Sequence, residues 1–269
     1  MFESYFNLLH TPFERNIPVE SLFHSPSFEE LMGLLSAVAR NRKFCVVTGD
    51  CGIGKTTAIR SFVSSLNRQS FRAVYISDSA LTPRAFYWEV LKELAGLEKP
   101  PFYRNDAKRK MMEVLTALLE AGKQIPIIII DEAHLLSYEM LEETRFLLNY
   151  RMDSQNPMSL LIVGQSELRT KLSKEIFEPI TQRIDFRFKI PAMDLSQTTE
   201  YISRHMSYAG ETRQVFSNGA IHKIFAYANG IPRKINKVCY LSLMAAAQRQ
   251  THIIEDSLVT YVIDQELTW

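Results

Sequence analysis

A loop of eight residues carries the most specific chemistry in this chain. It reads Gly-Asp-Cys-Gly-Ile-Gly-Lys-Thr from Gly49 to Thr56, which is the P-loop pattern. Glycines let the backbone turn sharply and present successive N–H groups to a polyphosphate. Lys55 can then reach the β- and γ-phosphates, the Thr56 hydroxyl can hold Mg²⁺, and the following helix adds its positive dipole end. The pattern predicts a site for ATP and Mg²⁺ formed by Gly49, Asp50, Cys51, Gly52, Ile53, Gly54, Lys55, Thr56 and Thr57.

Two adjacent acids form the second part of this candidate site. Asp131 and Glu132 follow an unbroken β-branched run, 127–130, which is typical of a strand covered on both faces of a parallel sheet. Ligands bind at the carboxyl ends of such strands. We therefore expect Asp131 to hold the water shell of Mg²⁺ and Glu132 to polarise the water that attacks the γ-phosphate. His134 is expected to pack or bond locally.

The elements that must position these residues follow from short apolar runs and helical periodicity. Candidate strands lie at 44–48, 72–77, 127–130, 158–163 and 184–190, and helices with apolar residues at three- and four-residue spacing lie at 86–95, 108–121 and 139–150. From residue 194 the pattern is helical only, at about 195–208, 217–228, 232–250 and 255–266. The prediction is an α/β fold, a doubly wound parallel sheet followed by a small all-helical lid. Its domains are an N-terminal segment (1–43), a nucleotide-binding domain (44–193) and the lid (194–269).

Composition limits the function without choosing it. The 269 residues carry a net charge of +1, so any attraction to nucleic acid must come from a local patch. There is no signal-peptide character and no apolar run near the roughly 20 residues of a membrane span, so we expect a cytoplasmic protein without a membrane partner. Cys45, Cys51 and Cys239 lack metal-ligand spacing, which fits a reducing compartment. Cys51 is expected to be a tolerated small side chain rather than a redox switch.

Taken together, the motifs resemble AAA+ ATPases of the ExeA/GspA-like group. Beside the P-loop and the acids after 127–130, the resemblance rests on Val-Gly-Gln at 163–165, Gln-Arg at 182–183, Gly-Ile-Pro-Arg-Lys-Ile-Asn at 230–236 and the opening Tyr-Phe-Asn-Leu at 5–8. It covers essentially the whole chain. It implies a five-stranded sheet, a helical lid, and ATP bound between neighbouring subunits of a ring or helical filament. It also implies that Gln165 is a first sensor of the γ-phosphate, that Arg233 is a second sensor from the lid, and that Phe13, after Pro12, belongs to the nucleotide site.

One arginine is expected to act on the ATP of an adjacent subunit. A guanidinium offered in trans neutralises charge that builds up on the transferred phosphoryl group. Arg183 is the best candidate for this arginine finger, and Arg169 and Arg187 are its rivals. The alternative is a surface arginine flanking an edge strand.

Within this group, the chain resembles stand-alone ATPases that act as transposition helpers, of the IstB, MuB and TnsC kind. Those proteins assemble on double-stranded DNA with ATP and hand a target site to a transposase or integrase. The resemblance places DNA against the loops beyond the second strand. The stretch 99–110 has five basic residues and one acid, which suits contacts to phosphate, although a solvated helix start would look the same. The candidate DNA-binding residues are Thr82, Arg84, Lys99, Tyr103, Arg104, Lys108, Arg109 and Lys110.

Two functions therefore stay open. The first is an oligomeric, DNA-stimulated ATPase of slow turnover that regulates target selection in DNA transposition. The second is an ExeA/GspA-like ATPase that energises secretion or protein-complex assembly without DNA. An origin-binding initiator ranks third, because no winged-helix segment is expected after the lid.

Overall fold

The computed structural model describes residues 2–78, 81–99, 101–122, 124–147 and 155–267. The chain forms two compact units. The sheet unit comprises Phe28–Cys51 and Lys55–Ile190, and the helical unit comprises Met1–Ser27, Gly52–Gly54 and Pro191–Trp269, each within the described residues.

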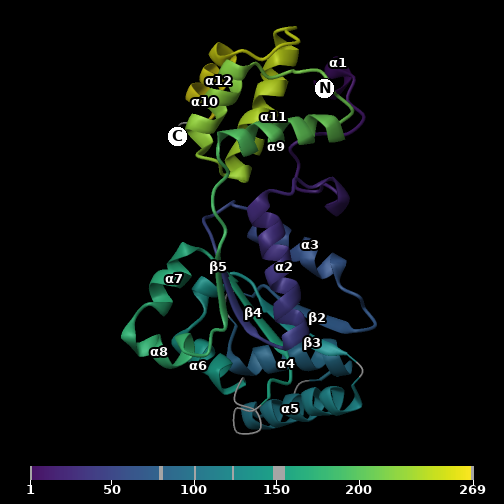
Figure 1. Ribbon diagram of the computed structural model, residues 1–269, viewed down its shortest axis with the longest axis vertical. Helices are drawn as coiled ribbons and strands as arrows, with labels where there is room; N and C mark the ends of the chain where they lie inside the picture. Colours follow the sequence, from purple (N-terminus) through teal and green to yellow (C-terminus); the bar gives the residue numbers. More distant parts are fainter. Residues whose placement is uncertain (1, 79–80, 100, 123, 148–154, 268–269) are drawn as a thin grey trace. The chain divides into compact units, whose positions relative to one another are not determined.

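The sheet unit is built on a five-stranded parallel sheet in the order β2-β3-β4-β1-β5 (Figure 1). Every residue of β1 and of β4 is buried, as expected for central strands covered on both faces. The paired register brings the carboxyl ends of β1, β3 and β4 to one edge of the sheet. The bounds are Phe44–Thr48 for β1, Phe71–Ile76 for β2, Ile125–Ile130 for β3, Ser159–Gly164 for β4 and Phe186–Lys189 for β5.

Helices cover both faces of the sheet, because successive strand residues point to opposite sides. One face, which includes Val47 and Ile129, packs against α2 and α3 through Leu35 and Phe62. The other face packs against the remaining helices of the unit (Figure 1). The helices are α2 Pro26–Asn41, α3 Lys55–Ser65, α4 Pro83–Ala95, α5 Arg104–Ala121, α6 Tyr138–Leu147, α7 Ser166–Leu172 and α8 Glu178–Thr181.

The predicted fold class is confirmed, and the predicted strand ends are within two residues of those in the structure. Helix starts were less accurate. α4 begins at Pro83 rather than 86, because the Thr82 hydroxyl accepts the Ala85 N–H and caps the helix. The helix at α2 and the short helices α7 and α8 were not predicted, and the last three residues of the predicted helix 139–150 lie outside the described residues.

The helical unit packs four long or medium helices with the N-terminal segment. Its core joins Ile224 and Val238 to Phe2, Phe6 and Phe13 from the start of the chain. Asp194 caps α9 in a capping box with Gln197. The helices are α1 Phe2–Phe6, α9 Leu195–Tyr208, α10 Asn218–Ala228, α11 Pro232–Gln248 and α12 Asp256–Val262, which runs into a short π-helical turn, Ile263–Leu267. None of the described helices has the length and apolar character needed to cross a membrane.

Candidate active site

The P-loop connects β1 to α3 and leads into a buried ammonium group. Gly52 and Gly54 have φ angles of +80° and +104°, which side chains disfavour. Lys55 is only 7% exposed, and its Nζ donates hydrogen bonds to the carbonyl oxygens of Gly49 and Asp50 at 2.8 and 3.0 Å. Burial lowers the pKa of Lys55, and nearby acids oppose that shift. A buried cation that is held by two neutral carbonyls fits a phosphate ligand at this loop.

The other predicted loop residues complete this turn. The Asp50 carboxylate accepts a hydrogen bond from the Ser166 hydroxyl at the start of α7. The Ile53 side chain is buried, whereas the Cys51 thiol is exposed. Thr57 continues the first turn of α3. The loop is therefore tied to α7, the helix that follows Gln165.

Asp131 joins three elements at the carboxyl edge of the sheet. Its Oδ2 accepts hydrogen bonds from the Thr56 hydroxyl at 2.9 Å and from the Tyr75 hydroxyl at 2.8 Å, and its Oδ1 accepts the Glu132 N–H at 2.8 Å. The carboxylate is 2% exposed. Thr56 and Asp131, the two residues predicted to bind Mg²⁺, are thus in direct contact. Hard oxygen donors of this kind suit Mg²⁺, whose remaining ligands are phosphates and water.

Sequence reasoning missed Tyr75. It lies in β2, next to Ile129 in the register of β2 and β3, and therefore close to the acid that follows β3. Partial burial and the hydrogen bond to Asp131 raise the pKa of Tyr75, so its hydroxyl stays protonated and donates at neutral pH. A tyrosine near the end of a strand is common, and only the neighbouring position of β2 and β3 reveals its partner.

Glu132 has an unusual backbone and a half-exposed side chain. Its φ of 54° and ψ of 30° lie in the left-handed region, which costs about 1 kcal/mol or more for a residue with a Cβ. Its Oε2 lies 3.5 Å from Gln165 Nε2 and 3.5 Å from His134 Nδ1. The contact with Gln165 is a hydrogen bond and a weak one at this length, whereas the contact with His134 is not a hydrogen bond. The structure therefore brings Glu132 and Gln165 together and leaves the carboxylate 41% exposed, with room to accept a water.

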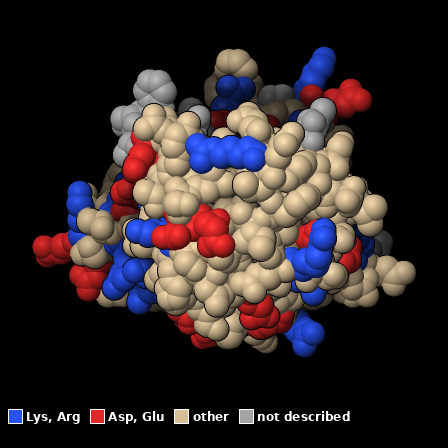
Figure 2. Space-filling model, turned by 90° about the horizontal axis from the view of Figure 1, so that it is seen from above, with Lys and Arg blue, Asp and Glu red and all other residues tan. Residues whose placement is uncertain are grey.

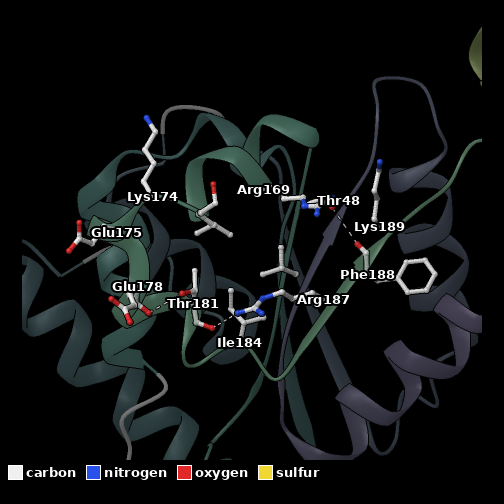
Figure 3. Close-up of a pocket in the computed structure, with 13 residues that line it drawn as sticks. Thr48, Arg169, Lys174, Glu175, Glu178, Thr181, Ile184, Arg187, Phe188 and Lys189 are labelled. Carbon is white, nitrogen blue, oxygen red and sulfur yellow. Dashed lines mark hydrogen bonds between the residues drawn. The ribbon is translucent and has the colours of Figure 1, made fainter.

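The three candidate arginines lie in or near the segment from α7 to β5. Arg183 lies between α8 and β5 and is partly buried. Arg187 in β5 donates from Nη2 to the Thr181 carbonyl oxygen at 2.6 Å. Arg169 in α7 and Arg187 line one pocket, into which both side chains extend (Figure 3). Which of the three acts in trans stays a prediction.

The two remaining predicted nucleotide contacts belong to the helical unit. Arg233 lies in the first turn of α11. Phe13 is 5% exposed, and its ring stacks on His205 with centroids 5.0 Å apart. Its backbone N–H donates to His205 Nδ1 at 3.1 Å. Phe13 thus packs in the core of the helical unit, and its role at a nucleotide stays a prediction.

The predicted surplus of positive charge at 99–110 is offset by acids that the sequence window did not contain. Arg104 and Lys108 both bind the buried Glu143 carboxylate, Arg104 also binds Glu139, and these acids come from α6. Within the described residues, four of the five basic side chains of this stretch form ion pairs, the others being Arg109 with Asp106 and Lys110 with Glu113. Asp106 is the one acid inside the stretch, and the acids that lie outside it are Glu113 of α5 and Glu139 and Glu143 of α6. Contact of these basic residues with DNA stays a prediction.

The contacts of the Glu143 carboxylate show that the ion pairs of Arg104 and Lys108 join helices of the sheet unit. It accepts a hydrogen bond from the buried Tyr87 hydroxyl in α4 as well as from Arg104 and Lys108 in α5. Burial alone would raise the pKa of Glu143, but these hydrogen bonds outweigh burial and lower it. Arg104 and Lys108 therefore hold α5 to α6. Of the other predicted DNA contacts, Thr82 caps α4, Arg84 lies over the Phe102 ring, and Tyr103 is 67% exposed.

Known proteins share sequence similarity with this chain. A family model described as AAA domain matches residues 38–172, which is half of the chain. General secretion pathway protein A of Aeromonas hydrophila is 28% identical over 281 residues, covering 100% of this chain and 50% of that protein. The chain therefore spans half the length of this relative. An uncharacterised HTH-type transcriptional regulator of Methanocaldococcus jannaschii is 23% identical over 267 residues, covering 86% of this chain and 64% of that protein.

Solved structures share the fold at low sequence identity. A Drosophila ORC structure bound to DNA superimposes with a TM-score of 0.74 at 15% identity, covering 100% of this chain and 66% of that chain. Cdc6p of Pyrobaculum aerophilum gives a TM-score of 0.65 at 17% identity, covering 94% of this chain and 68% of that chain. At these identities the similarity concerns the fold alone. On the family match and the P-loop that it includes, the chain belongs to the AAA domain family.

Proposed function

We propose that this chain hydrolyses ATP at the P-loop and couples turnover to the assembly or remodelling of a protein complex. The observation that carries the first part is the contact of Thr56 with Asp131 at 2.9 Å beside the buried ammonium of Lys55. In this proposal the hydroxyl binds the metal, the carboxylate orients the metal's water shell and the ammonium binds phosphate, and the proximity of the three groups supports these roles.

Each residue of the site has a separate role in the proposed hydrolysis of ATP. Lys55 and the N–H groups of the loop bind the phosphates, and Thr56 and Asp131 would hold Mg²⁺. Mg²⁺, when bound, neutralises charge on the β- and γ-phosphates. Tyr75 and the Glu132 N–H fix the orientation of the Asp131 carboxylate. Glu132 accepts the proton of the attacking water, Gln165 orients Glu132 and reads the γ-phosphate, and Arg183 of a neighbouring subunit neutralises the developing charge.

The second part of the proposal rests on the similarity to General secretion pathway protein A, which extends over the whole of this chain. One observation favours this assignment over DNA binding. The basic stretch 99–110 is largely paired with acids. Figure 2 shows one face of the molecule, on which Lys and Arg are scattered among Asp, Glu and uncharged residues. Regulation of transposition, with a transposase as partner, stays a prediction from the sequence.

The test separates nucleotide binding from hydrolysis. Lys55→Ala should lose ATP binding, because the Lys55 ammonium is the buried cation that the loop carbonyls hold for the phosphates. Glu132→Gln should bind ATP within about twofold of the wild type but lose roughly 10²-fold or more of the turnover, as expected for a lost general base. Glu167→Gln, at an exposed position of α7, is the matched control and should keep both ATP binding and turnover. Normal turnover in Glu132→Gln would reject the assignment of the base.

The alternative function, DNA binding, is tested by a separate binding measurement. Binding of a labelled duplex to the ATP-bound protein is measured at low salt, where contacts to phosphate are strongest. Our proposal expects no difference between the wild type and Lys108→Ala/Arg109→Ala/Lys110→Ala. Tight binding in the wild type that this triple variant loses, while Arg40→Ala/Lys92→Ala keeps it, would return the DNA function to first place.

A further inference from the structure

A pocket of about 830 Å³ lies beside the edge strand of the sheet, and its lining includes Thr48 but none of the residues 49–57 of the P-loop. One wall is β5, and the opposite wall is α7 with the segment that leads to α8 (Figure 3). Its apolar floor includes Val46, Leu172 and Ile184. The volume is within the range of sites that hold a ligand or several side chains.

Four cations line this pocket against two acids. Arg187 and Lys189 lie two residues apart in β5 and therefore project from the same face, on which Val46 and Thr48 are their partners in β1. Arg169 and Lys174 approach from the opposite wall, and Glu175 and Glu178 are the acids. In the part of the chain that the structure describes, neither the Arg169 guanidinium nor the Lys189 ammonium has a hydrogen bond or an ion pair. The pocket thus offers uncompensated positive charge.

The strand beside the pocket is open on one side. β5 pairs with β1 only, and among the described residues no strand pairs with its outer edge. An edge of this kind leaves backbone N–H and C=O groups that an extended peptide can bind by adding a strand. Side chains of an added strand would alternate between the two faces of the sheet.

The two faces of β5 call for different side chains. On the pocket face an added strand meets Arg187 and Lys189, with Arg169 beyond them. On the opposite face it meets Phe186, which is 37% exposed, and Phe188, which packs on the core of that face. An acidic residue at every second position and an apolar residue between them would match both faces.

We propose that the outer edge of β5 and this pocket form a docking site for an extended segment of a partner protein with alternating acidic and apolar residues. The carboxylates lie among Arg169, Lys174, Arg187 and Lys189, and the apolar side chains cover Phe186. This proposal goes beyond ATP hydrolysis and does not require turnover.

The test uses the full chain without nucleotide, so its failure would leave the ATPase proposal standing. The probe is a fluorescent ten-residue peptide of alternating Glu and Val, and its binding is followed by anisotropy. Two peptides serve as controls, one of alternating Gln and Val and one with five Glu followed by five Val. We expect the alternating acidic peptide to bind at least about tenfold more tightly than either control.

Variants locate the site. Lys174→Gln/Lys189→Gln should weaken binding of the acidic peptide about tenfold, as two lost charge contacts predict. Arg40→Gln/Lys92→Gln removes two exposed cations from α2 and α4 and should leave it unchanged. Hydrogen exchange should show protection of the amides of 186–189 when the peptide is bound, which reports strand addition independently of any variant.

Three results would overturn the proposal. They are equal binding of the Glu and Gln peptides, equal losses in the two double variants, and no protection at 186–189. Displacement of the bound peptide by inorganic tripolyphosphate at the same concentration would also overturn the proposal, because it would show that the site binds a small anion rather than a peptide.

Discussion

At the scale of single residues, Asp131 depends on donors from three segments of the chain. Thr56 comes from α3, Tyr75 from β2 and the Glu132 N–H from the turn after β3. A carboxylate that is held by several donors has a defined orientation before any ion arrives, which reduces the free energy cost of forming the metal site. Tyr75 is therefore a positioning residue for Asp131.

Tyr75→Phe removes one of these donors without changing the shape of the side chain. We expect the Mg²⁺ concentration for half-maximal turnover to rise between about three- and tenfold, the effect of one lost hydrogen bond to a charged group. ATP binding at saturating Mg²⁺ should change little. Tyr138→Phe is the matched control, since both tyrosines are 45% exposed. The same Mg²⁺ dependence in Tyr75→Phe and Tyr138→Phe would contradict the role of Tyr75.

At the scale of elements, the N-terminal segment is held to α9 by an unprotonated histidine. His205 Nδ1 accepts the Phe13 N–H, so this nitrogen must lack a proton. Burial lowers the pKa of His205 to about 4. The backbone of Phe13 has a φ of 62°, and this hydrogen bond and the stacked rings stabilise that conformation.

This histidine makes folding of the helical unit dependent on pH. The pKa of His205 is lower in the folded chain than the ordinary histidine value of about 6.5, so the unfolded chain binds more protons below pH 6.5. Stability is therefore highest above pH 6.5 and falls as the pH drops toward 4, by about 3 kcal/mol for this group alone.

His205→Asn should remove this pH dependence while its amide oxygen still accepts the Phe13 N–H. Denaturant unfolding of both proteins between pH 7 and 4 measures the difference. We expect the free energy of unfolding of His205→Asn to fall by about 3 kcal/mol less than that of the wild type over this range. Parallel pH curves for the two proteins would show that His205 is not the titrating group.

At the scale of the whole molecule, our proposal needs a third cation besides Lys55 and Arg233, one that neutralises the charge developing on the transferred phosphoryl group. The candidates for that cation, Arg169, Arg183 and Arg187, lie in α7, before β5 and in β5. Action in trans requires an assembly of several copies. Both our proposal and the resemblance to ring- or filament-forming ATPases include such an assembly.

Mixing two inactive variants tests this arrangement. Arg183→Ala should bind ATP but lose most of its turnover, and Glu132→Gln should do the same. In a mixed assembly some interfaces join an intact Glu132 to an intact Arg183, so activity should partly return. Arg183→Ala mixed with Glu132→Gln/Arg183→Ala contains no such interface and is the control. If co-assembly is demonstrated and no ratio restores activity, Arg183 does not act in trans.

The sequence by itself determined the fold class, the strand positions and the identity of the P-loop. These features depend on residues that are close in the chain: a glycine loop of set spacing, apolar runs that end in Asp131 and Glu132, and helical periodicity after residue 194. Local spacing carries this information because the loop binds phosphate through consecutive backbone groups, and because strands buried on both faces are continuously apolar.

Only the tertiary structure decided which distant residues meet. The order β2-β3-β4-β1-β5 brings Tyr75 next to Asp131 and leaves β5 at an edge. The packing of α5 on α6 pairs Arg104 and Lys108 with Glu143, which removes free charge that a count along the sequence assigned to DNA. The packing of Phe13 on His205 of α9 buries the Phe13 ring in the core of the helical unit. Hydrogen bonds and ion pairs of this kind join residues 35 to 192 positions apart, and no local spacing in the chain records them.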